Sequence, residues 1–239
     1  MVIESHKRPM EQLFRHRFMI LLAALLLLLA LYPFLEQDVS ERLLSLFFTG
    51  TLIAGTYAVS RDRRFLVAAV VIAVGAFGSQ WLSHFVNSRI VFVFSRSLGC
   101  LFYLLITVAI VVNVLKGETV TADKICGGIC AYLVMGLMWA FLFGLIEVVH
   151  PGSFLENGHL IATTEGRTHQ FALLNSMIYY SLATLTTTTY GDITAKTTPA
   201  RALSNLEAIA GQMYIAVLIS RLVALHIMYH FNPRAQTKD

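Results

Sequence analysis

The chain has 239 residues, of which 56% are hydrophobic and 13% are charged, and its formal net charge is +4. This composition excludes an ordinary soluble domain. In a soluble protein the positive charge would suggest a nucleic-acid partner. In a membrane protein the positions of the charged residues along the chain indicate its topology instead, and we expect no nucleic-acid partner.

Six apolar runs follow one another along the chain, and each approaches the roughly 20 residues that cross a hydrocarbon core of about 30 Å. They cover residues 18–35, 43–60, 65–85, 90–114, 125–149 and 199–226. Basic residues gather in residues 7–17, 61–64 and 116–124 and again in the tail. Because cytoplasmic loops carry the excess of Lys and Arg, we predict an all-α membrane protein with six spans and both termini in the cytoplasm.

The fourth run carries Arg89 and Arg96 and no further basic residue. A voltage sensor needs several Arg or Lys at every third position. We therefore predict that residues 18–116 form a four-helix transmembrane domain without a voltage-sensor arginine repeat. A charge inside the bilayer needs a partner, and we expect Arg96 to pair with Glu147 or Glu207.

Between the last two runs, residues 184–192 read T-L-T-T-T-T-Y-G-D. The stretch resembles the pore of the tetrameric potassium channels, in which a pore helix ends in T-T-V-G-Y-G-D and an inner helix follows. The residues that match this signature in order are Thr186, Thr187, Tyr190, Gly191 and Asp192. Thr188 stands where an aliphatic residue is usual, and Thr189 stands where the first glycine belongs. The first four runs fit this family only in number and topology.

The resemblance implies a homotetramer in a lipid bilayer, because one chain carries one loop and a closed ring of ligands needs several. It also implies a filter over residues 187–191, aided by the Thr187 hydroxyl. The carbonyls expected to hold K+ belong to Thr187, Thr188, Thr189 and Tyr190. The residues expected to support the filter are Thr186, Asp192, Tyr179, Tyr180 and Glu207, with both of these tyrosines against Tyr190. The pore helix would turn the partial negative charge of its C-terminal end, near Thr186, toward the cavity.

The same layout divides the pore domain, residues 125–226, into successive parts. These are an outer helix 125–149, a turret 150–173, a pore helix 174–186, the filter and an inner helix 199–226, between cytoplasmic segments 1–17 and 227–239. Thr198 followed by Pro199 is typical of a helix start. The predicted hinge is Gly211, and the predicted gate is a helical face made of Gln212, Ile215, Ile219 and Val223. We expect no ligand-binding domain on the same chain.

Thr189 leaves the ion preference open. In the related filters the glycine at this place has a positive φ, which costs a β-branched residue about 1–2 kcal/mol. The loop either holds this strain and selects K+, or takes another shape with weaker selectivity over Na+, or does not conduct. We predict a potassium-channel-like cation channel whose selectivity is open to alteration at Thr189. The alternatives are a weakly selective cation channel and a non-conducting regulatory membrane subunit.

No motif of an intramembrane enzyme occurs in the chain, whether H-E-x-x-H, G-x-S-x-G or paired intramembrane aspartates. Cys126 and Cys130 lie one helical turn apart, but two thiols without a third ligand favour buried apolar residues over a metal site. We expect no enzymatic activity and no cofactor other than the permeant K+ or another monovalent cation. The expected location is the plasma membrane, as in the bacterial inner membrane.

Overall fold

The computed structural model describes residues 17–31, 67, 70–75, 78, 89–115, 122–161 and 167–231. The elements in chain order are α2 (Arg17–Leu31), α5 (Arg89–Leu115), α6 (Ala122–Val149), β1 (Phe154–Glu156), β2 (His159–Leu160), α7 (Arg167–Leu185), β3 (Ile193–Ala195) and α8 (Thr198–Phe231). The expected second span, most of the third and the terminal segments 1–16 and 232–239 lie outside these residues. The part that is described is mostly helical, as predicted.

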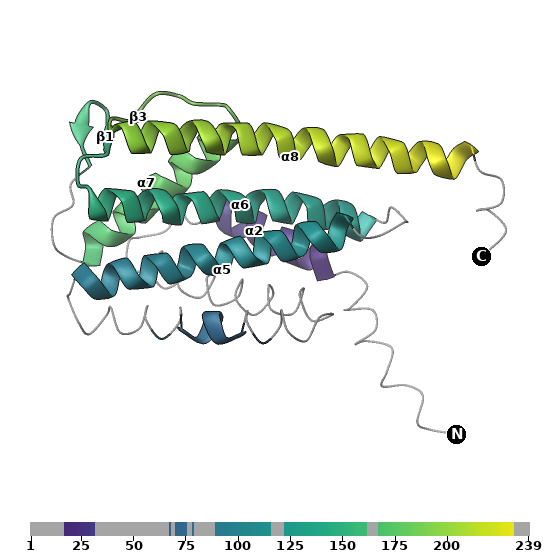
Figure 1. Ribbon diagram of the computed structural model, residues 1–239, viewed down its shortest axis with the longest axis horizontal. Coiled ribbons are helices and arrows are strands. Elements are labelled where there is room, and N and C mark those ends of the chain that lie inside the picture. Colours follow the sequence, from purple (N-terminus) through teal and green to yellow (C-terminus); the bar gives the residue numbers. More distant parts are fainter. Residues whose placement is uncertain are drawn as a thin grey trace, which may run out of the picture.

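Three of the described helices contain segments long and apolar enough to cross a membrane, namely Val93–Leu115, Ala122–Val149 and Thr198–Arg221. They belong to α5, α6 and α8, which run side by side along one axis (Figure 1). The apolar part of α7, Ala172–Leu185, is shorter. α7 crosses obliquely behind α6 and α8 and packs against both. The apolar helices therefore indicate a membrane protein in which α7 is a short helix held between longer ones.

α6 is the central helix and packs against α2, α5, α7 and α8. It is apolar around its whole circumference, which is the pattern of a helix buried on all sides. Within its most apolar window 61% is buried inside the chain, against 11% for α8. The 34 residues of α8 span about 51 Å, so α8 projects beyond α5 and α6 (Figure 1). A single chain thus covers little of the apolar surface of α8.

The N-terminus of α2 is fixed to the first turn of α6. Asp123 Oδ1 accepts the backbone N–H groups of Phe18 (3.0 Å) and Met19 (3.3 Å), which have no partner within their own helix. The Phe18 ring lies so close to Gly127 that a Cβ there would come within 3.2 Å of it. These contacts place the beginnings of α2 and α6 at the same end of the helix bundle.

Arg96 lies in α5 and is only 8% exposed. Its guanidinium carbon is 5.3 Å from the centre of the Phe141 ring of α6, which is the range of a cation–π contact. The two carboxylates expected to pair with Arg96 contact other groups. Glu147 accepts backbone N–H groups after the end of α6, and Glu207 contacts Ser181 of α7. The described contact of Arg96 across to α6 is therefore with an aromatic ring.

The segment after α6 forms a small antiparallel sheet in the order β2-β1-β3, which the all-α prediction did not include. β1 and β2 are joined by Asn157 and Gly158, whose φ values are 50° and 81°. Two central residues with positive φ define a type I′ turn, and Asn-Gly is the pair that adopts it most readily. β3 follows the candidate filter loop and pairs with β1, so the first part of the turret, residues 154–160, belongs to a sheet that reaches the end of this loop.

α7 begins at Arg167 rather than at Leu174, where the sequence placed its start. Residues 167–170 read R-T-H-Q and continue the helix without apolar side chains. The predicted start at Leu174 therefore lies inside the helix, after its first seven residues.

Candidate functional site

The loop between α7 and β3 begins with a hydrogen-bond pattern that turns the chain back over the last turn of α7. The N–H of Thr187 donates to the carbonyl of Thr184 (3.0 Å), and the N–H of Thr188 donates to that of Ala183 (2.8 Å). Together with the φ of 58° at Thr187 these bonds form a Schellman motif, in which the left-handed residue is usually glycine. Thr187 is therefore a strained residue that the sequence analysis did not foresee.

Left-handed residues alternate along this loop, with φ values of 58° at Thr187, 31° at Thr189 and 85° at Gly191. Thr188 and Tyr190, between them, do not have positive φ. When left- and right-handed residues alternate, successive N–H groups converge on one side of the chain, and successive carbonyls turn to the other. The positive φ that the sequence left as one alternative for Thr189 is present. Residues 186–192 are all exposed in the single chain, so the loop is accessible to a ligand or to other copies.

Threonine hydroxyls and one amide surround the inner end of the loop. The Thr186 hydroxyl donates to the Leu182 carbonyl (2.7 Å) and lies 2.9 Å from the Thr188 hydroxyl. The Thr187 hydroxyl donates to the Thr186 carbonyl (2.7 Å) and accepts a long bond of 3.5 Å from Gln212 Nε2. The first residue of the predicted gate face therefore lies against the predicted filter.

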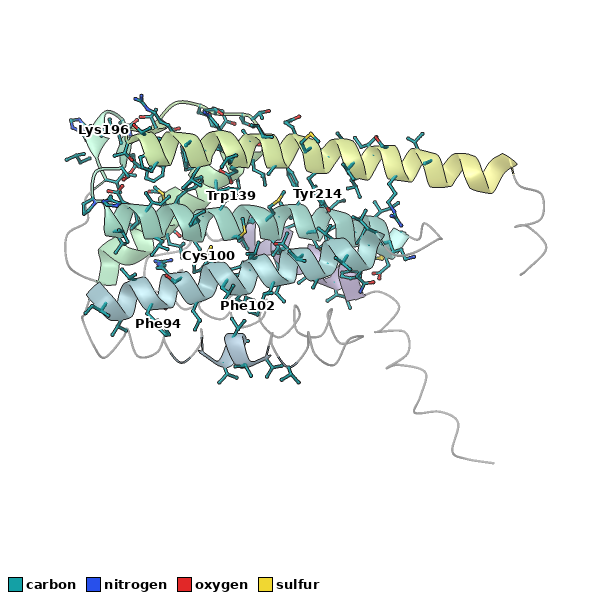
Figure 2. All side chains as sticks on the ribbon, in the orientation of Figure 1. Phe94, Cys100, Phe102, Trp139, Lys196 and Tyr214 are labelled. Carbon is teal, nitrogen blue, oxygen red and sulfur yellow. The ribbon has the colours of Figure 1, made fainter. Side chains whose placement is uncertain are left out.

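The carbonyl of Leu185, the last residue of α7, is held from α6 and approached closely by α8. The Tyr132 hydroxyl donates to it (2.9 Å), and the Tyr132 ring stacks on that of Tyr214 at 5.8 Å. Tyr214 in turn lies between α8 and α6, where its hydroxyl donates to the Gly128 carbonyl (2.7 Å; Figure 2). A Cβ on Gly211 would lie 2.5 Å from the Leu185 oxygen. α8 continues unbroken through Gly211, so glycine is required there by the close approach of two backbones.

The carbonyls of the last turn of α7 already accept hydrogen bonds from these donors. The expected partial negative charge at the end of α7 is therefore shared with Tyr132 and with the N–H groups of the loop itself. The oxygens still exposed at this end are those of the loop.

The two tyrosines expected beside Tyr190 point to different places. Tyr179 stacks on Tyr190 with ring centres 6.2 Å apart and planes 8° from parallel. The Tyr179 hydroxyl donates a hydrogen bond to the carboxylate of Asp192, which raises the pKa of Tyr179 to about 12. Tyr180 is 6% exposed, its ring packs on Phe154 at 5.1 Å, and its hydroxyl lies 2.7 Å from that of Ser204. Tyr180 thus belongs to the core and not to the surroundings of Tyr190.

Glu207 of α8 is 0% exposed. Its Oε1 is 2.5 Å from the Ser181 hydroxyl oxygen, which also lies 2.7 Å from the Gly136 carbonyl. Its Oε2 is buried and has no hydrogen-bond partner among the described residues. The three residues join α6, α7 and α8 at one point. Glu207 therefore contacts α7 at Ser181, one turn before the loop, and not the loop itself.

The predicted gate face of α8 is largely uncovered in the single chain. Ile219 is 55% exposed, Val223 is 51% exposed, and Gln212 is also exposed, whereas Ile215 is half-buried. The neighbouring apolar side chains are exposed as well, namely Leu206, Ile209, Met213 and Val217. A continuous apolar surface of this kind marks contact with other protein or with lipid.

Among the described residues no group of three or more His, Cys, Asp or Glu side chains is placed to hold a metal ion. Cys126 and Cys130 are free thiols. The loop itself offers oxygen ligands, from its backbone carbonyls, its threonine hydroxyls and the Asp192 carboxylate.

Residues 129–226 match a protein-family model described as "Ion channel". Searches of the curated proteins and of the solved structures gave no match. The matched region takes in most of α6, the turret, α7, the threonine-rich loop and α8 as far as His226. The family match over this region, together with the apolar helices around it, supports placing the chain in an ion channel family.

Proposed function

We propose that four copies of this chain assemble around a common axis into a potassium-channel-like cation channel, with residues 187–191 of each copy forming the filter. The observation that carries this proposal is the alternation of positive φ at Thr187, Thr189 and Gly191 in an exposed loop, a backbone pattern that is able to turn successive carbonyls to one side. The match of residues 129–226 to an ion channel family supports the same conclusion.

Assembly from several chains follows from geometry. One loop supplies oxygens on one side of a cation, whereas a dehydrated cation needs ligands all round. Cyclic symmetry supplies them with identical copies. The uncovered apolar surface of α8, with 11% of its most apolar window buried, provides the area over which copies pack.

In this assembly K+ exchanges its hydration shell for the carbonyls of Thr187, Thr188, Thr189 and Tyr190, with the Thr187 hydroxyl at the inner end. The gate face of α8 lines the path below the filter. A ring of Ile219 or Val223 side chains would close that path by excluding water.

Thr189→Gly tests how the loop sets selectivity. A positive φ costs a threonine about 1–2 kcal/mol and costs glycine nothing, so the glycine loop holds its carbonyls without this strain. We expect the permeability ratio of K+ to Na+ to rise by about tenfold, equivalent to about 1.4 kcal/mol. The measurement is the reversal potential with K+ on one side of a planar bilayer and Na+ on the other.

Thr188→Gly is the matched control, because Thr188 does not have a positive φ. Glycine there relieves no strain and adds backbone freedom, so selectivity should not rise. Flux that is unselective in the parent and selective in Thr189→Gly would show that the ring of Thr189 residues weakens the selectivity of the parent. Flux that occurs only in Thr189→Gly would mean that the parent filter is closed. An equal rise in both glycine variants would show that strain at Thr189 is not the cause.

Tyr179→Phe tests the bond at the outer mouth of the loop. The substitution keeps the stack on Tyr190 and removes the hydrogen bond to Asp192. We expect a lower permeability ratio, and a less than additive loss when Asp192→Ala is added, because both changes remove the hydrogen bond between Tyr179 and Asp192. The Tyr179 hydroxyl donates this bond only while it is protonated, and its pKa is raised from 10 to about 12. The stabilisation by the bond is therefore fully present below about pH 10 and is lost as the pH rises through about 12. Additive losses in the double variant would contradict a direct bond.

A further inference from the structure

The outer end of the loop is tied residue by residue to the turret. β3 pairs with β1 in the register Phe154–Ala195, Leu155–Thr194 and Glu156–Ile193. Two more backbone bonds extend this ladder, from Asn157 N to the Asp192 carbonyl (2.7 Å) and from Lys196 N to the Ser153 carbonyl (2.8 Å). Lys196 lies at the end of the bundle where the sheet sits (Figure 2). The chain therefore leaves the filter directly into a bonded strand, with the first bond at Asp192.

β1 is in turn bonded to the end of α6 through one carboxylate. Glu147 is 0% exposed and lies in the last turn of α6. Its Oε1 accepts the N–H of Gly152 (2.7 Å), and its Oε2 accepts that of Phe154 (2.9 Å). The N–H of Ser153 also donates to it. Three successive backbone groups at the start of β1 are thus held by a single side chain.

The same strand is anchored in the core by an aromatic side chain. Phe154 is 0% exposed, and its ring centre is 5.5 Å from that of Phe143 in α6 and 5.1 Å from that of Tyr180 in α7. β1 cannot move as a free loop, because its first residue is packed between two helices. A displacement of the end of α6 is carried through β1 and β3 to Asp192.

We propose that the turret sheet clamps the outer mouth of the filter, and that Glu147 is the positioning residue which transmits the position of α6 to that mouth. This inference rests on the proposed function, because the mouth is defined by conduction through the loop. Glu147 lies outside the filter and acts only through the backbone of residues 152–157 and 192–196.

The first test is Glu147→Gln, which keeps the size of the side chain but turns an NH₂ group toward backbone N–H donors. The Asn157 and Lys196 amides bond β1 to the segment that leaves the filter. Their hydrogen exchange should become about tenfold faster, which is the effect expected from the loss of one charge-assisted hydrogen bond. In planar bilayers the reversal potential between K+ and Na+ should shift toward zero. Glu156→Gln is the matched control, because Glu156 is exposed on the same sheet and its removal deletes the same charge near the mouth.

The second test restores the clamp by a covalent bond. Leu155 and Thr194 are direct partners, and Cα atoms of antiparallel partners lie about 4.5–5.5 Å apart, within the range of disulfides. The substitutions Leu155→Cys and Thr194→Cys are added to Glu147→Gln. Oxidation, which forms the disulfide, should return the reversal potential to that of the parent, and reduction should shift it away again. The pair Leu155→Cys and Leu160→Cys closes only the β1–β2 hairpin and should not restore it. The parent treated with the same oxidant controls for its own free thiols.

Unchanged exchange in Glu147→Gln, or an equal shift of the reversal potential in Glu156→Gln, would overturn the clamp. So would a reversal potential that stays shifted once the Leu155–Thr194 disulfide has formed. Absence of flux in the parent and in Thr189→Gly alike would contradict the proposed function instead, whereas faster exchange in Glu147→Gln alone would still support the bonded path from α6 to Asp192.

Discussion

Gly211→Ala is expected to lower cation flux by about tenfold or more and to lower the melting temperature of the assembly. The added Cβ would lie 2.5 Å from the carbonyl oxygen of Leu185, closer than two such atoms can approach. Alanine favours a helix over glycine by about 1 kcal/mol, but overpacking costs about 1–3 kcal/mol. Here the obstacle is backbone, which cannot rotate away, so the clash outweighs the helix preference.

The consequence for function comes from the position of Leu185. It ends α7, it holds the Tyr132 hydrogen bond, and Thr187 follows two residues later. Separating α8 from α7 therefore moves the inner end of the loop. Gly144→Ala is the control, because a Cβ at this glycine of α6 meets no atom within 4 Å. It should keep the flux of the parent. Parent-like flux and melting temperature in Gly211→Ala would contradict the close approach.

Glu207→Ala is expected to destabilise the assembly by about 2–5 kcal/mol, the cost of emptying a fully buried site of comparable size. The lost contact with Ser181 loosens α7 against α8, so flux should fall with stability. Thermal unfolding in detergent and flux in vesicles measure the two effects.

Glu207→Gln separates packing and hydrogen bonding from charge at this site. The Ser181 hydroxyl has one hydrogen and faces two oxygens, those of Gly136 and Glu207. A glutamine amide has the same size, carries no charge and adds a donor beside the Ser181 and Gly136 oxygens, so we expect stability and flux at least equal to those of the parent. Loss of flux in Glu207→Gln at unchanged stability would mean that the carboxyl has a role beyond joining the helices.

The helix boundaries around the loop were predicted better than its backbone. The resemblance of residues 184–192 to a known pore was sufficient to expect a helix end before the loop and a long helix after Pro199, whereas it left a positive φ at Thr189 as one of several alternatives. The strain at Thr187 was missed, because a Schellman motif is usually marked by glycine and here a threonine occupies its left-handed position.

The turret strands, the burial of Tyr180 and the close approach at Gly211 were not predicted, because their signals in the sequence are weak or absent. Asn157-Gly158 is a strong hairpin signal, but the strands beside it have only three and two residues and resemble an irregular loop. The direction of Tyr180 follows from its place on the helix, one residue and about 100° from Tyr179. The close approach that requires Gly211 is a contact between distant segments, and no spacing in the sequence predicts it.

Release of K+ from vesicles that contain the purified full chain tests the central claim most directly, with protein-free vesicles and Thr189→Gly alongside. The proposed function predicts K+ release down its gradient from vesicles with the parent chain and none from vesicles without protein. A folded, membrane-inserted assembly that releases no K+, in the parent and in Thr189→Gly alike, would contradict conduction through residues 187–191 and favour a regulatory membrane subunit.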